Sequence, residues 1–132
     1  MTPPLTPGAY LKMRRSAAGL SVADVAARIA TAPRLAEHAR VELIELIEAD
    51  AAPASFATIV VFNNVYSFDI EVLATLERIN LGADLPAPQL CRICACSAYD
   101  PCFGRTVFGP CFWVEDDLCS ACATPPARSA VA

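Results

Sequence analysis

The chain has 132 residues, of which 55% are hydrophobic, and it carries seven cysteines and a formal net charge of −4. This length allows one domain of ordinary size, or one small domain followed by a unit too small to fold by hydrophobic burial alone. Two units are favoured, because alanine and aliphatic residues dominate up to about residue 85 whereas all seven cysteines lie between Cys91 and Cys122. The negative net charge argues mildly against nucleic-acid binding by the whole chain, since phosphates attract lysine and arginine.

The first ten residues point to a cellular compartment. They contain four proline or glycine residues and no apolar run, so we expect no secretory signal peptide there. A cytoplasmic protein is the expectation, and clustered thiols in a reducing compartment more often hold metal than form disulfides. Residues 51–68 are uncharged but contain proline, serine and asparagine, so we expect no transmembrane helix and no membrane partner.

Five helices are predicted before the cysteines, over residues 7–18, 21–30, 35–50, 56–66 and 69–82. The first, second and fifth begin at Thr6, Ser21 and Asp69, whose side-chain oxygens can accept a hydrogen bond from the first turn. The third is the most clearly periodic, with apolar residues at helical spacing. The fourth is rich in β-branched residues that suit a strand equally well, but a lone strand would have no evident partner, so we assign a helix.

The predicted organisation is a mainly α chain that ends in a small metal-binding module. The helical domain covers residues 1–84, a proline-containing linker 85–90, the cysteine-rich module 91–122 and a disordered tail 123–132. Charge is uneven along the helical part. Residues 1–40 carry six basic and two acidic side chains, a net charge of +4, whereas residues 41–90 carry eight acidic and one basic, a net charge of −7. We therefore expect a basic face beside an acidic one.

The two outer cysteine pairs are the strongest signal in the sequence. Cys91 and Cys94, like Cys119 and Cys122, are separated by two residues, a spacing that lets one tight turn point both sulfurs at one ion. Two such turns complete a tetrahedral four-thiolate site, for which zinc is the expected metal. The module has too little apolar content to fold alone, and a structural zinc ion contributes on the order of 10 kcal/mol.

The three inner cysteines, Cys96, Cys102 and Cys111, have several possible roles. They can form a second metal site, include a reversible disulfide or stay as buried thiols. Water or a nearby carboxylate can complete a second site, and the candidates are Asp100, Asp116 and Asp117. Alternatively, four of the seven cysteines can hold an iron–sulfur cluster, which also uses closely spaced thiolates. We favour a second metal site over a disulfide.

Two segments of the helical part resemble a known DNA-binding family. They are Ala18-Gly19-Leu20-Ser21 with Asp24-Val25-Ala26, and the set Ile44, Ile47 and Glu48. Over about residues 8–80 the chain is similar to Cro/Xre-type helix-turn-helix repressors, in which Gly-Leu-Ser/Thr opens the second helix and Ile-x-x-Ile-Glu ends the third. The resemblance implies a five-helix domain whose third helix enters the major groove of double-stranded DNA.

The sequence departs from this family around the third helix. Residues 31–40 replace the family's tight turn, and Glu42 and Glu45 stand where bases and phosphates are normally contacted. Since carboxylates repel phosphates, DNA contacts are expected from basic residues elsewhere. These are Arg28, Arg34, Arg40, Lys12, Arg14 and Arg15. The single histidine, His38, is expected at the surface.

The cysteine-rich segment, residues 91–122, also looks like a tail found in uncharacterised phage and prophage-type bacterial proteins. The similarity rests on the phrases Cys-Arg-Ile-Cys-Ala-Cys and Cys-Phe-Trp-Val-Glu-Asp-Asp-Leu-Cys-Ser-Ala-Cys. It implies no particular activity. We expect no enzymatic activity, since four thiolates close a metal site and the sequence has no evident catalytic triad, phosphate loop or catalytic carboxylate cluster.

Together these features predict a small phage or bacterial DNA-binding regulator of transcription with a structural zinc module that can support a homodimer. One alternative is a protein-interaction adaptor that keeps the helix-turn-helix-like fold and meets a basic host protein through its acidic surface. That surface would contain Glu42, Glu45, Glu48 and Asp50. The other alternative is an iron–sulfur or redox sensor.

Overall fold

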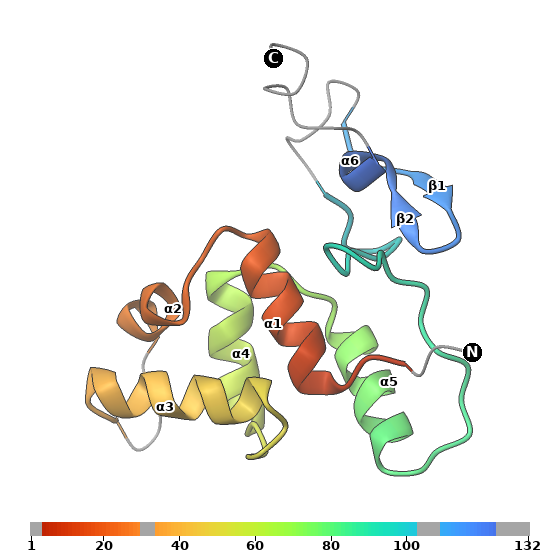
Figure 1. Cartoon of the computed structure of the whole chain (residues 1–132). Coiled ribbons are helices and arrows are strands. Elements are labelled where there is room, and N and C mark those ends of the chain that lie inside the picture. Colours follow the sequence, from red (N-terminus) through yellow and green to blue (C-terminus); the bar gives the residue numbers. More distant parts are fainter. Residues whose placement is uncertain (1–3, 30–33, 103–108, 124–132) are drawn as a thin grey trace. The chain divides into compact units, whose positions relative to one another are not determined.

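A computed structural model of the protein describes residues 4–29, 34–102 and 109–123 (Figure 1). The described residues form six helices and one two-stranded antiparallel sheet. The elements are α1 (Pro7–Ala17), α2 (Val22–Arg28), α3 (Glu37–Glu48), α4 (Phe56–Val65), α5 (Ile70–Asn80), β1 (Trp113–Glu115), β2 (Leu118–Cys119) and α6 (Ser120–Ala123). The expectation of a mainly α chain is confirmed, and residues 56–66, which also suited a strand, contain helix α4.

The chain divides into two compact units, which we call the helical unit (Met1–Ala87) and the cysteine unit (Pro88–Ala132). The division falls inside the predicted linker, residues 85–90. The predicted tail beyond Ala123 lies outside the described residues. Within the part of the chain that the structure describes, no helix has the length and apolar character needed to cross a membrane.

Local capping explains where several helices begin. Thr6 Oγ1 accepts a hydrogen bond from the Ala9 N–H at 3.1 Å at the start of α1. Ser21 and Asp24 form a reciprocal capping box at the start of α2, because each side chain accepts from the other's backbone N–H, at 2.9 and 3.0 Å. These bonds satisfy N–H groups that have no partner within the first helical turn, which is why the predicted starts agree with the observed ones.

The core of the helical unit joins all five of its helices. Helix α1 packs on α3 and α5, and α2 packs on α3 and α4. Its most deeply buried large apolar side chains are Tyr10, Leu11, Val25, Ile44, Phe62 and Leu76. The Tyr10 hydroxyl also accepts a hydrogen bond from the Asp69 N–H at 2.8 Å, which ties α1 to the start of α5.

A buried ion pair connects α1 to the end of α3. Arg15 Nε and Nη2 donate to the two carboxylate oxygens of Glu48 at 2.7 and 2.9 Å. Arg15 Nη1 also donates to the Leu20 carbonyl at 2.9 Å. Both charged side chains are nearly closed to solvent, with relative exposures of 10% and 6%. This bidentate geometry fixes the orientation of α3 relative to α1.

Gly8 allows the same two helices to approach closely at the other end of α1. A Cβ atom at this position would lie 2.6 Å from the Glu48 carbonyl oxygen and would also collide with the Ile47 carbonyl. The Gly8 N–H instead donates to Asp50 Oδ1 at 2.9 Å. Because the obstructing atoms belong mainly to the backbone, a larger residue here would force the helices apart.

Candidate metal centre

The first cysteine pair lies on a tight turn. The Ala95 N–H donates to the Cys91 carbonyl at 2.8 Å, and the Ile93 N–H donates to Cys91 Sγ at 3.5 Å. Ala95 has a φ of +61°, a left-handed conformation that lets the chain reverse directly after Cys94. The turn therefore brings Cys91 and Cys94 close together on one side of the loop.

The second pair is positioned by a small hairpin and one helical turn. Strands β1 and β2 pair antiparallel, with Trp113 opposite Cys119. The Ser120 N–H donates to the Phe112 carbonyl at 2.7 Å, and Ser120 Oγ accepts from the Phe112 N–H at 3.0 Å. Helix α6 begins directly after Cys119 and carries Cys122 back towards the same point.

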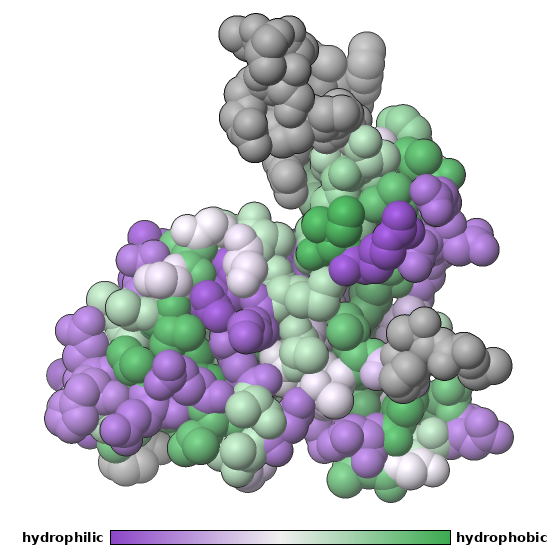
Figure 2. Space-filling view, viewed as in Figure 1, coloured by the Kyte–Doolittle hydropathy of each residue, from purple (hydrophilic) through white to green (hydrophobic). Residues whose placement is uncertain are grey.

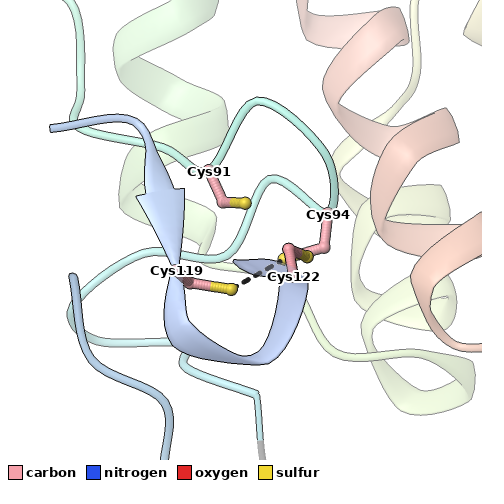
Figure 3. A group of neighbouring side chains, drawn as sticks. All are labelled: Cys91, Cys94, Cys119 and Cys122. Atoms are coloured by element: carbon pink, nitrogen blue, oxygen red, sulfur yellow. Dashed lines mark hydrogen bonds between the residues drawn. The ribbon is translucent and has the colours of Figure 1, made fainter. Parts of the chain in front are cut away.

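The four outer cysteines converge, as the sequence predicted. Figure 3 shows their sulfurs pointing towards one another from the loop, β2 and α6, and all four lie within 4.8 Å of one another. Cys94 Sγ and Cys119 Sγ are 3.8 Å apart. A zinc–sulfur bond of about 2.3 Å gives a tetrahedral edge of about 3.8 Å, whereas a disulfide needs about 2.05 Å. All seven cysteines are described, and none forms a disulfide. This cluster can hold a metal ion.

The inner cysteines are placed differently from the prediction. Cys96 and Cys102 form a second group with Cys94 and Cys119, whose sulfurs also lie within 4.8 Å of one another. Cys111 lies beside this group, with its sulfur 3.7 Å from Cys96 Sγ. The predicted second site used Cys96, Cys102 and Cys111 with a carboxylate or water, but the structure completes the group with sulfurs shared with the outer site.

Two of the predicted carboxylate ligands lie outside the sulfur cluster because the β1–β2 hairpin places them on its exposed turn. Asp116 and Asp117 are both exposed. The Asp117 carboxylate pairs with Arg92, and its carbonyl accepts from the Arg92 N–H at 2.8 Å. These contacts join the hairpin turn to the Cys91–Cys94 loop. Asp117 therefore supports the cluster from outside.

The thiols differ strongly in acidity. Burial disfavours the thiolates of Cys91 and Cys119, but hydrogen bonds outweigh it, holding the pKa of Cys119 at about 6 and that of Cys91 below its usual range. Burial and neighbouring thiolates raise the pKa of Cys102 to about 12, and burial is also the main cause that raises the pKa of Cys94. Close thiolates repel one another, so a bound cation is what allows all of them to ionise together.

The cysteines themselves form the interior of the cysteine unit. Among its described residues, Leu118 and Ala95 are the buried apolar residues other than cysteine. Trp113 packs against the cluster and is partly buried. An interior of this kind offers little hydrophobic stabilisation, which agrees with a unit whose folding depends on a metal ion.

Comparisons of the chain with protein-family models, with curated proteins and with solved structures give no match. The resemblances to helix-turn-helix repressors and to phage-type tails therefore stay predictions.

The six basic residues predicted to contact DNA fall into two groups. Lys12, Arg28 and Arg34 are exposed. Arg14 and Arg15 are buried, which corrects the expectation that they meet DNA. Arg15 pairs with Glu48, and Arg14 Nε donates to the Ser67 carbonyl at 3.2 Å.

Arg40 also makes hydrogen bonds within the helical unit. Its Nε donates to the Ala26 carbonyl at 2.6 Å and its Nη1 to the Leu35 carbonyl at 2.8 Å, so it links α2 to the residues that precede α3.

The remaining predicted surface residues lie on α3 and directly after it. His38 is exposed on α3, as expected. Of the predicted acidic surface, Glu42, Glu45 and Asp50 are exposed. Glu48 is buried by its pairing with Arg15 and does not belong to that surface.

Proposed function

We propose that the protein is a small DNA-binding regulator whose cysteine unit is a structural zinc–thiolate module. The observation that carries the zinc part of this proposal is the convergence of the four outer sulfurs, from two separate Cys-x2-Cys pairs, to within 4.8 Å of one another. Zinc fits this donor set because it accepts four thiolates in a tetrahedron and performs no redox chemistry. Four thiolates leave no open position on the metal, so the role of the ion is structural rather than catalytic.

The DNA-binding part is supported by the arrangement of α1, α2 and α3. Helices α2 and α3 pack against each other, and the Arg15–Glu48 pair holds α3 in a defined orientation. Hydrophilic side chains cover much of the visible face around α2 and α3 (Figure 2), and the exposed cations of this unit include Lys12, Arg28 and Arg34. We assign phosphate contacts to these three residues, since exposed cations are what neutralise phosphates.

The DNA assignment is tested by fluorescence anisotropy with a labelled random duplex over a salt series. The Arg28→Ala, Arg34→Ala double variant is expected to bind more weakly and to lower the salt slope by about 0.9 for each phosphate contact removed. Arg78→Ala is the matched control, because Arg78 is an exposed cation on α5. Failure of the wild type to bind at micromolar concentration, or an equal effect of the control, would refute the assignment.

The zinc assignment is tested by elemental analysis of the full chain purified without oxygen. A colourless protein with bound zinc is expected. Iron with absorption near ~400 nm would instead establish the iron–sulfur alternative.

A protein-interaction adaptor is the second candidate, and the exposed face of α3 favours it. Glu42 and Glu45 are exposed there beside Leu46, an apolar side chain with 47% exposure. Such a face suits a basic partner protein better than phosphates. The Glu42→Gln, Glu45→Gln variant separates the two functions. A DNA-binding protein should bind DNA more tightly once this repulsion is removed, whereas an adaptor should lose its co-purifying basic partner.

A further inference from the structure

We propose that the cysteine unit binds two metal ions that share the thiolates of Cys94 and Cys119. The terminal ligands would be Cys91 and Cys122 on the first ion, and Cys96 and Cys102 on the second. This inference rests on the proposed zinc module and adds a second ion to it. Its basis is the way in which the two groups of sulfurs overlap.

The overlap is a shared edge between two four-sulfur groups. In each group every sulfur lies within 4.8 Å of the others, and Cys94 and Cys119 belong to both. Their separation of 3.8 Å equals the edge of a zinc–thiolate tetrahedron, about 3.8 Å. Cys94 is also 3.6 Å from Cys102, which belongs to the second group only. The Cys94 sulfur therefore lies at the sulfur–sulfur distance of a zinc–thiolate tetrahedron from a sulfur of each group.

The number of cysteines also requires sharing if two ions are bound by four thiolates each. Two separate four-thiolate ions would need more cysteines than the seven in the chain. The carboxylates that might have replaced a thiolate on the hairpin, Asp116 and Asp117, are exposed. A bridging thiolate meets the requirement without any further ligand, since one sulfur has lone pairs enough for two ions.

Charge balance favours the second ion once the first is bound. A second divalent ion would reuse the Cys94 and Cys119 thiolates and displace one proton each from Cys96 and Cys102 to solvent. It adds as much positive charge as the new thiolates add negative charge, so the net charge of the buried cluster stays the same. A separate four-thiolate ion would instead add further negative charge to a buried site, which is costly.

Cys111 is assigned as a neighbour of the cluster rather than a ligand. Its sulfur lies 3.7 Å from Cys96 Sγ and accepts a hydrogen bond from the Cys102 N–H at 3.2 Å. It is less buried than Cys96 or Cys102 and does not belong to either four-sulfur group. Cys111 therefore offers a matched control for substitutions of the terminal ligands.

The test is a zinc count on the full chain by native mass spectrometry, after purification under reducing conditions with added zinc. Two ions are expected in the wild type and in Cys111→Ser. The Cys96→Ser, Cys102→Ser variant should keep one ion. A single ion in the wild type would overturn the sharing but leave the proposed zinc module intact, whereas no bound ion would overturn both. Loss of an ion from Cys111→Ser would show that Cys111 is a ligand and would overturn the proposed set of six ligands.

A second measurement does not depend on the folding of any variant. The wild-type chain loaded with ¹¹³Cd should give two cadmium resonances that are scalar-coupled to each other through the shared sulfurs. Two resonances without mutual coupling would show separate ions and would overturn the proposal.

Discussion

Replacing Arg15 with methionine should destabilise the helical unit severely. The substitution leaves the Glu48 carboxylate, whose side chain is only 6% exposed, without its two charged hydrogen bonds of 2.7 and 2.9 Å. It also removes the donor to the Leu20 carbonyl. Breaking a buried pair by removing one partner costs about 3–5 kcal/mol, because an uncompensated charge stays in the interior. This is a large part of the stability of a small domain.

The assay is urea unfolding of the full chain followed by circular dichroism, in which the helical unit dominates the signal. Lys12→Met is the control on the same helix, and because Lys12 is exposed we expect a change within about 0.5 kcal/mol. Adding Glu48→Leu to Arg15→Met should restore most of the lost stability, since apolar replacement of both partners is often neutral or stabilising. A loss below about 1 kcal/mol for Arg15→Met, or no recovery in the double variant, would refute this reasoning.

Three further substitutions or treatments test other contacts. Gly8→Ala should lower the free energy of unfolding by about 1–3 kcal/mol through overpacking, although alanine is otherwise the better helix former. An unchanged or higher melting temperature would contradict the close approach of α1 to the end of α3. Tyr10→Phe removes the hydroxyl that accepts from the Asp69 N–H and should lower the free energy of unfolding in urea by about 1–3 kcal/mol. An unchanged free energy of unfolding would argue against a structural role for this hydrogen bond. A metal chelator should shift Trp113 fluorescence to the red while the helical circular dichroism persists; simultaneous loss of both signals would show that the units do not unfold separately.

The helices were predictable because their signals are local. Thr6, Ser21 and Asp69 accept hydrogen bonds from N–H groups within the next few residues, so sequence spacing is enough to identify them. The role of Arg15 was not predictable in the same way. Its partner Glu48 lies in another helix, and an arginine near the end of a helix is usually exposed. Only tertiary packing shows that this charge belongs to the interior.

Part of the candidate site was predictable, again because its signals are local. Each Cys-x2-Cys pair is local, and each brings its two sulfurs to the same cluster, the first pair on a tight turn and the second across the start of α6. The overlap of the two four-sulfur groups at Cys94 and Cys119 depends on the β1–β2 hairpin, which was not predicted from the sequence. The local signal is weak: the acidic pair Asp116-Asp117 separates Trp113-Val114-Glu115 from Leu118-Cys119, but two-residue hairpin turns favour sequences that contain glycine. A strand of two or three residues is too short for periodicity to identify it reliably.

The zinc–thiolate module is tested most directly by X-ray absorption at the zinc edge on the native protein. We expect a first shell of sulfur alone, about four atoms at about 2.3 Å from each zinc ion. A first shell containing nitrogen or oxygen, or a protein that carries iron in place of zinc, would contradict the proposed module.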